Sequence, residues 1–174
     1  MATHAIAFLG DKVLRQKSAP VDAKEITSKK IRDIIKRMSL VLRATEEGIG
    51  IAAPQIGIPL QIFIASEEAL AIDRRDADLE KPPKKKWRHF VFINPQVVKV
   101  SAKKTKGSEG CLSVPKKYGI VARAEKIKIR ALDEHGKKIE RGASGLFARL
   151  LQHEIDHLYG TLYIDKAEKI VDIA

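Results

Sequence analysis

The 174-residue chain has a single cysteine, so it forms no intrachain disulfide and is not a disulfide-stapled secreted domain. Aromatic residues make up only 5%, which argues against a stacking platform for single-stranded nucleic acid. No apolar run approaches the roughly 18 residues of a membrane span, so we expect no membrane segment. The remaining composition, 44% hydrophobic and 32% charged, is ordinary for a globular protein, and the length suits one domain over residues 1–174.

The net charge of +11 is concentrated in residues 81–106, which contain no acidic residue. The basic residues there are Lys81, Lys84, Lys85, Lys86, Arg88, Lys99, Lys103, Lys104 and Lys106. Two interpretations stay open: a solvated loop and hairpin that aid solubility, or an electrostatic footprint for an anionic partner such as ribosomal RNA.

The hydrophobic spacing predicts two helices and several strands, which is the pattern of the α+β class. The first helix begins at Thr27 or Ser28 and ends near residues 46–48, because Ile31, Ile34, Ile35, Met38 and Leu42 recur at helical spacing. The expected strands cover residues 60–65, 90–93, 97–100 and 126–132, with a hairpin turn at 134–137 and a second helix at about 143–158. Residues 66–89 read as a long polar surface connection.

The second helix carries an H-E-x-x-H motif at His153–His157. The two histidines lie about 40° apart on one helix face, which suits two ligands of one metal ion. Glu154 falls inside the apolar arc of this helix, where an unpaired carboxylate is costly unless it faces a metal-bound water. The alternative is two core histidines and a stray glutamate on an ordinary helix.

A third ligand is needed for a catalytic metal. The extended zinc-protease form of the motif keeps Gly160 but has Tyr163 in its last position. Cys111 is the best candidate, because a thiolate with two imidazoles leaves a fourth position open and suits zinc or iron. Weaker candidates lie downstream: Asp165, Glu168 and Asp172. Two alternatives remain for Cys111, a buried thiol without a role and half of a Cys–His nucleophile pair. The remaining histidines, His4, His89 and His135, lack ligand spacing and are expected on the surface.

Three segments together resemble the peptide deformylase family. They are Gly48–Gln55 (G-I-G-I-A-A-P-Q), Glu109–Ser113 (E-G-C-L-S) and Gln152–His157 (Q-H-E-I-D-H), in the family's order. By itself the first segment fails as a dinucleotide fingerprint, because its spacing breaks at Ala53. The resemblance extends from Lys12 to the end of the chain. It implies mixed and antiparallel β-sheets packed around a central helix that carries the H-E-x-x-H motif.

The family's activity is removal of the N-formyl group from the initiator methionine of new polypeptides, with release of formate. The resemblance implies that Cys111, His153 and His157 hold one divalent metal, Fe²⁺ in cells, with Zn²⁺, Ni²⁺ or Co²⁺ able to replace it. Metal-bound water would attack the formyl carbon, with Glu154 as general base and acid. Gln55 and the Leu112 backbone N–H would stabilise the oxyanion.

The resemblance also implies the residues around the reaction. Ile49, Gly50 and Gly110 are expected to contact the extended peptide. We predict that Leu146 and Leu150 line the methionine pocket, because they project beside the histidines, although plain core packing would also explain them. Arg123 is expected to pair with Glu109 or Asp156 and brace the ligands.

This chain departs from the family's pattern at four places. Gly10-Asp11 stands where the family commonly has Pro-Asp, and the 66–89 connection is longer than in many members. Lys116, Lys117 and Tyr118 stand where some members carry an arginine near the substrate mouth. The chain ends soon after Asp165, without the long helix by which some members dock on the ribosome, and the basic stretch 81–106 is hypothesised to replace it. The resemblance implies a monomer in a bacterial-type cytoplasm, with an organelle still open. The competing hypotheses are an inactive ribosome-binding homologue and a peptidase that cuts internal bonds.

Overall fold

The computed structural model describes residues 6–73 and 88–173. Its helices are α1 (Lys29–Ala44), α2 (Glu68–Asp73), α3 (Gly145–Leu158) and the 3₁₀ turns η1 (Lys12–Arg15), η2 (Ala53–Ile56) and η4 (Tyr163–Asp165). Its strands are β1 (Gly50–Ala52), β2 (Ile62–Ser66), β3 (His89–Val100), β4 (Lys104–Cys111), β5 (Val114–Ala124), β6 (Lys126–Leu132), β7 (Lys138–Ser144) and β8 (Lys169–Asp172).

The strands form two sheets, one of five strands in the order β1-β2-β3-β6-β7 and one of three in the order β4-β5-β8. Every strand pair in both sheets is antiparallel. An isolated parallel bridge joins Ala19 to Leu60. The predicted α+β class is therefore confirmed, and of the mixed or antiparallel sheets that were expected, both described sheets are antiparallel.

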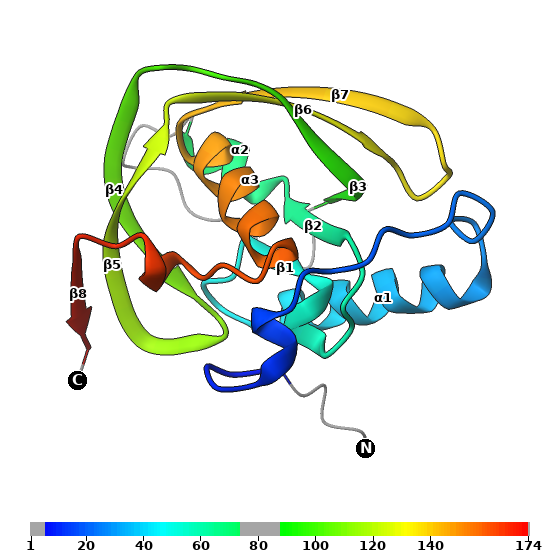
Figure 1. Cartoon of the computed structure of the whole chain (residues 1–174), viewed down its shortest axis with the longest axis horizontal. Helices are drawn as coiled ribbons and strands as arrows, with labels where there is room; N and C mark the ends of the chain where they lie inside the picture. The colour runs from blue at the N-terminus through cyan, green and yellow to red at the C-terminus, as the bar shows by residue number, and fades with distance from the viewer. Residues whose placement is uncertain (1–5, 74–87, 174) are drawn as a thin grey trace.

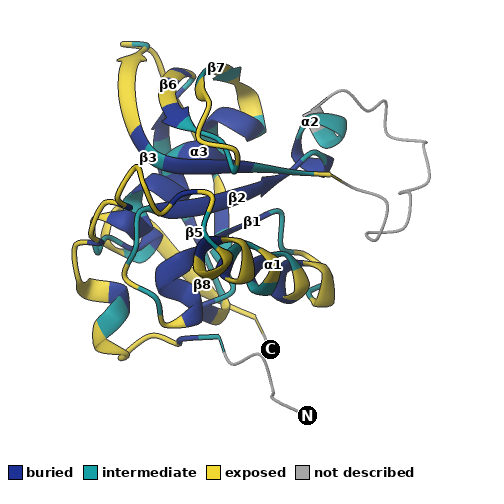
Figure 2. Ribbon diagram, turned by 90° about the vertical axis from the view of Figure 1, so that its right-hand side faces the viewer, coloured by how far each residue is buried: buried dark blue, intermediate teal, exposed yellow. Residues whose placement is uncertain are grey.

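Helix α3 lies at the centre, with β4 and β5 to its left, β6 and β7 above it and α1 below on the right (Figure 1). Its residues Phe147, Leu151 and Leu158 are buried against Phe63 and Phe92 of the five-stranded sheet. Figure 2 shows the resulting core as a dark-blue zone that contains α3, β1 and β2. The Gln152 amide fixes the other flank of the helix, since it accepts from Ala124 N–H and donates to Ala124 C=O.

Helix α1 covers the opposite side of the β1–β2 hairpin. Its N-cap is Ser28, whose hydroxyl accepts from Ile31 N–H at 3.3 Å, so the predicted cap is confirmed. The buried face consists of Ile31, Ile34, Met38, Val41 and Leu42. The helix ends at Ala44, earlier than expected.

The prediction of separate strands at 90–93 and 97–100 is wrong, because β3 runs through Asn94-Pro95 as one strand. Register shifts between Ile93 and Gln96 accommodate the proline. Asn94 has a φ of 51°, and its side chain bonds both to the N–H and to the C=O of Val21. The backbone of Val21 thus holds β3 in place at its register shift.

The polar connection expected at 66–89 is structured where it is described. Helix α2 occupies Glu68–Asp73, and residues 74–87, with Pro82-Pro83, lie outside the described residues.

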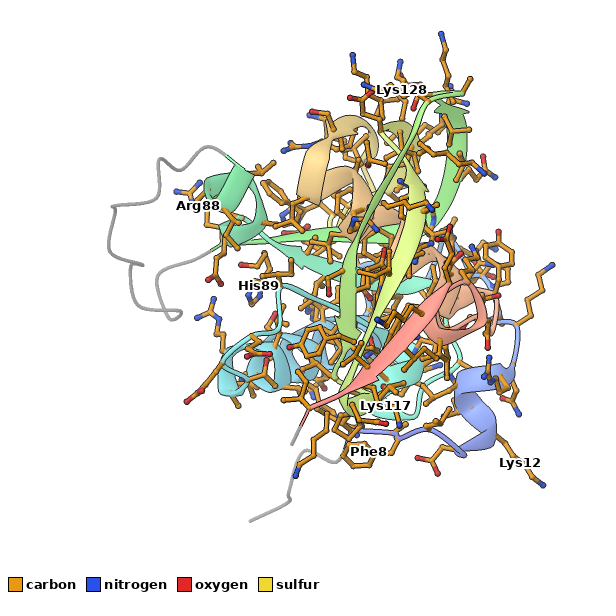
Figure 3. All side chains as sticks on the ribbon, turned by 90° about the vertical axis from the view of Figure 1, so that its left-hand side faces the viewer. Phe8, Lys12, Arg88, His89, Lys117 and Lys128 are labelled. Atoms are coloured by element: carbon orange, nitrogen blue, oxygen red, sulfur yellow. The ribbon has the colours of Figure 1, made fainter. Side chains whose placement is uncertain are left out.

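Among the other histidines, His135 is exposed, and His4 lies outside the described part of the chain. His89 is half-buried and faces α1 (Figure 3), with its Nδ1 3.1 Å from Ser39 Oγ. In the ranges that the structure covers, every helix is too short or too polar to cross a bilayer.

Gly160 ends the turn after α3 under a steric constraint. Its φ is +74°, and a Cβ there would lie 2.5 Å from the backbone oxygen of Arg15. We expect Gly160→Ala to lower the free energy of unfolding by about 2–4 kcal/mol, because both the conformation and the close backbone contact oppose a methyl group. Chemical denaturation measures this, with Gly142→Ala as the control, since a Cβ at Gly142 meets nothing within 4 Å. A loss no larger than that of the control would contradict the argument.

Candidate metal centre and active site

Three potential ligands converge at the centre of the fold. Cys111 ends β4, and His153 and His157 lie on successive turns of α3. One ligand atom from each lies within 4.8 Å of the others, and Cys111 Sγ is 3.3 Å from His157 Nε2. A tetrahedral zinc site would separate sulfur and nitrogen by about 3.5 Å. The spacing and the chemistry of the donors therefore fit one divalent ion.

The three weaker candidate ligands lie in ion pairs instead. Asp165 pairs with Arg15, Glu168 with Lys106, and Asp172 with Lys117. Within residues 6–73 and 88–173, Cys111, His153 and His157 form the one group of three donors that meets the distance criterion for a metal.

Glu154 lies beside this donor set and is only 2% exposed. Its Oε2 is buried without a hydrogen-bond partner among the described residues. Burial raises the pKa of the Glu154 carboxyl to about 7, outweighing the opposing charge of His153. A carboxyl with a pKa near neutrality can both accept and return a proton, which is what a general base and acid requires.

Glu109 organises the charged groups around His153. Its carboxylate accepts from Arg123 Nε and Nη2 at 2.8 and 2.9 Å, from Arg149 Nη1 at 2.8 Å, and lies 3.0 Å from His153 Nδ1. Burial alone would raise its pKa, but the hydrogen bonds from Arg123 and His153 hold the pKa of the Glu109 carboxyl far below its usual range. Glu109 therefore stays ionised and fixes the orientation of the His153 ring.

Arg123 contacts both carboxylates that the sequence offered as partners. Besides Glu109, it donates from Nη1 to Asp156 Oδ2 at 2.5 Å, and Asp156 also accepts from Lys166 at 2.7 Å. The side chain of Arg123 is only 3% exposed. Arg123 thus links the strand β5 to the helix that carries both histidines.

The electrostatics of the centre favour a positive charge. Burial lowers the pKa of His153, but its contacts with Cys111 and Glu109 prevail and raise that pKa to about 10. His157 shows the opposite shift: burial, followed by the nearby charge of His153, lowers its pKa well below the usual value. Cys111 and Glu109 thus attract a cation to His153, and a bound metal would take the place of that proton, because a metal-binding imidazole must be neutral.

Gln55 is oriented by both ends of its amide. Its Oε1 accepts from Ala52 N–H at 2.9 Å, and its Nε2 donates to Ser113 Oγ at 3.2 Å. The same nitrogen lies 3.5 Å from Cys111 Sγ. The amide donor is therefore aimed at the thiol side of the centre.

A cavity of about 390 Å³ opens onto this centre. Several residues selected from the sequence line it: Ile49, Gly50, Gln55, Glu109, Gly110, Cys111, Leu112, Leu146, Leu150, His153 and Glu154. Gly50 is essential to the approach of β1, because a Cβ there would lie 2.6 Å both from Glu154 Oε1 and from Leu150 Cδ1. Arg123 and Asp156 are not among the residues that line the cavity. Arg123 bonds to Glu109, which lines it, and to Asp156 on α3.

Sequence reasoning missed three residues of the site. Arg149 donates to Glu109 and to the backbone oxygens of Val121 and Thr105. Its position four residues before His153, on the same helix face, is a signal that could have found it. Ser113, which accepts from Gln55, was within reach as the last residue of the E-G-C-L-S segment, whereas nothing in the sequence indicated that the Tyr163 ring stacks on His153 at 6.1 Å.

Two imidazoles, a thiol and a buried carboxyl around an open cavity define the class of mononuclear metallohydrolases. The polypeptide deformylase family model matches residues 3–172. The chain therefore belongs to the polypeptide deformylase family.

Similar proteins come from plants and bacteria. Peptide deformylase 1A of Arabidopsis thaliana, named as chloroplastic and mitochondrial, is 42% identical over 92% of this chain, which spans 60% of that relative's length. Peptide deformylase of Carboxydothermus hydrogenoformans is 37% identical over 98% of this chain and 97% of the relative. A Met-Ala-Ser-bound crystal structure of the class I type b enzyme from Acinetobacter baumannii aligns with a TM-score of 0.78 and 32% identity, covering 92% of this chain and 96% of that one.

Proposed function

We propose that this protein is a metal-dependent hydrolase that removes the N-formyl group from the initiator methionine of new polypeptides and releases formate. The observation that carries the proposal is the convergence of Cys111, His153 and His157 beside a buried, unpartnered Glu154 oxygen in an open cavity. Residues 1–174 would act as one catalytic domain. The intact ligand set disfavours the alternative of an inactive ribosome-binding homologue.

Cys111, His153 and His157 would hold the metal, which we propose is Fe²⁺ in the cell, with Zn²⁺, Ni²⁺ or Co²⁺ as substitutes. When bound, a divalent ion supplies a water whose pKa is lowered towards neutrality. Glu154 would take the proton from that water at its carboxylate and return it to the nitrogen of the departing methionine amine. The hydrogen bond from His153 Nδ1 to Glu109 keeps the ring directed at the centre throughout.

The formyl oxygen gains negative charge when its carbon is attacked. The amide of Gln55 has two hydrogens: one is donated to Ser113 Oγ, and the other points at Cys111 Sγ, 3.5 Å away, from where it would turn to this oxygen. The backbone N–H of Leu112, the residue after Cys111, would be the second donor. Each such donor is worth roughly 3 kcal/mol in the transition state.

The cavity fits a peptide whose first side chain is apolar. Leu146 and Leu150 line it on the helix side and would contact the methionine side chain. Strand β1 is the edge of its sheet, so the backbone at Ile49 and Gly50 can pair with an extended peptide, with Gly110 on the opposite wall. The Acinetobacter baumannii neighbour was crystallised with Met-Ala-Ser, which supports a peptide in this position.

Formate release from a formylmethionyl tripeptide, compared with hydrolysis of the same peptide without the formyl group, tests the activity. Release of formate alone is the expected result. Cleavage of the unformylated peptide would instead favour a peptidase of internal bonds. Elemental analysis of protein purified without oxygen identifies the native metal.

Metal removal should affect both activity and stability. We expect a chelator to abolish formate release and to lower the thermal midpoint, because a ligand present at 1,000 times its Kd stabilises the folded state by about 4 kcal/mol. Adding back Fe²⁺ without oxygen should restore both. Calorimetry that shows the same midpoint with and without the chelator would contradict a metal held by Cys111, His153 and His157.

We also propose transient ribosome contact through the basic residues 81–106. In the described part of this stretch, Lys103 pairs with Glu125 and Lys106 with Glu168, so these two charges are partly compensated. We expect salt-sensitive cosedimentation with ribosomes that weakens when Lys84, Lys85 and Lys86 become Glu. Cosedimentation that changes neither with the salt concentration nor with these substitutions would contradict the proposal. We further propose that the protein is a monomer and that it acts in a bacterial-type cytoplasm or in an organelle.

A further inference from the structure

A hydrogen bond joins two partly exposed side chains that line the cavity. Tyr118 Oη donates to Glu47 Oε2 at 2.6 Å, and both residues line the cavity that holds Cys111 and Glu154. The two residues are 71 positions apart in the sequence: Glu47 lies in the segment between α1 and β1, and Tyr118 lies on β5. Neither Glu47 nor Tyr118 has a role in the proposed removal of the formyl group.

Tyr118 is held firmly on its wall. It lies on β5 opposite Val171 of β8, and the preceding residue, Lys117, accepts at its backbone oxygen from Tyr163 Oη at 2.8 Å. The Lys117 side chain, labelled beside β8 in Figure 3, pairs with Asp172. The Tyr118 ring covers Gly110, because a Cβ there would lie 2.9 Å from Tyr118 Cε1. The hydroxyl is therefore presented from a rigid support.

Glu47 is held through the segment between α1 and β1. It directly precedes Gly48 and Ile49, and Ile49 C=O accepts from Ser66 N–H at 2.7 Å, which ties this segment to β2. The hydrogen bond to Glu47 raises the pKa of Tyr118, so the phenol is protonated at neutral pH and donates. Hydrogen bonds from a neutral donor to a carboxylate are stronger than neutral pairs.

We propose that Tyr118 and Glu47 form a strap across the mouth that positions the peptide residues after the formylmethionine. The inference rests on the proposed function, because it requires the cavity to hold the formylated end of a peptide. The formyl group and the methionine would then lie deep, near His153 and Leu150, and the following residues would leave at the strap. A carboxylate accepts several hydrogen bonds, so Glu47 can hold Tyr118 and a peptide N–H together.

The test compares two substrates, formylmethionine amide, which ends before the strap, and a formylmethionyl tripeptide, which reaches it. We expect Tyr118→Phe to lower the ratio of kcat/KM for the tripeptide over that for the amide by about fivefold to tenfold, through KM. Glu47→Ala should do the same, and the double variant should match either single variant, because the two groups act as one unit. Glu47→Gln keeps an acceptor for the phenol and should have a smaller effect.

Tyr159→Phe is the matched control, since Tyr159 is half-exposed and outside the residues that line the cavity. It should leave the ratio unchanged. Equal losses on both substrates, additive effects of the two substitutions, or a lower tripeptide KM would each overturn the strap. Metal content and thermal midpoint of each variant separate these outcomes from misfolding. If the parent protein released formate from neither substrate, the proposed function would fail, and the strap with it.

Discussion

Replacing Glu154 with glutamine is expected to lower kcat for formate release by about 10²–10⁴-fold, the range that general acid–base catalysis contributes. Glutamine keeps the size of the side chain but cannot accept and return the proton. The metal content should be unchanged, because Glu154 is not in the donor group of Cys111, His153 and His157. The thermal midpoint should not fall, because the substitution removes a carboxyl whose pKa is raised by burial and whose Oε2 lacks a partner.

Formate release at saturating peptide measures this, alongside elemental analysis. Glu134→Gln provides the control, because it makes the same chemical change at a carboxylate whose side chain is 43% exposed and that is not among the residues lining the cavity. Turnover within tenfold of the parent, with full metal content, would contradict the role of Glu154.

The second large effect concerns the buried charge network. Arg123→Leu should lower the free energy of unfolding by about 3–5 kcal/mol, because it removes one partner of a buried ion pair. Glu109 would keep Arg149 and His153, and Asp156 would keep Lys166. Since Glu109 orients His153, we also expect metal affinity to fall by about 10–100-fold.

Denaturant titration and competition with a chromophoric chelator measure the two effects. Arg130→Leu is the control: its side chain is 55% exposed, and its partner Glu140 is also paired with Lys128, so little should change. If Arg123→Leu lost stability but kept full metal affinity, Arg123 would serve the fold alone.

Much of the site could be predicted because its chemistry is local in sequence. His153 and His157 share a helix face through their spacing alone, and the apolar arc around Glu154 correctly placed it in the interior. Cys111 was proposed as the third ligand from its donor chemistry, and the family resemblance then supported that choice, because nothing local in the sequence ties a residue at the end of β4 to α3. The Glu109–Arg149 contact joins residues 40 positions apart, and only the packing of β4 against α3 creates it.

The strands could likewise be predicted where the pattern is local in sequence and were missed where only pairing with another strand defines them. β6 was predicted because it alternates buried and exposed residues and lies over the core. β4 was missed because Lys104, Thr105, Lys106, Ser108 and Gly110 give it almost no apolar face; it is a strand because β5 pairs with it along its length. α2 escaped notice because six residues are too few to establish a helical period.

Gly50 has a consequence for how this protein can change. The strand and the helix approach so closely there that a methyl group has no room beside Glu154 and Leu150. Any residue larger than glycine at position 50 would therefore displace the carboxyl from its working position. Variation in substrate range must instead arise at the rim, where Tyr118 and Glu47 can be exchanged without disturbing the reactive groups.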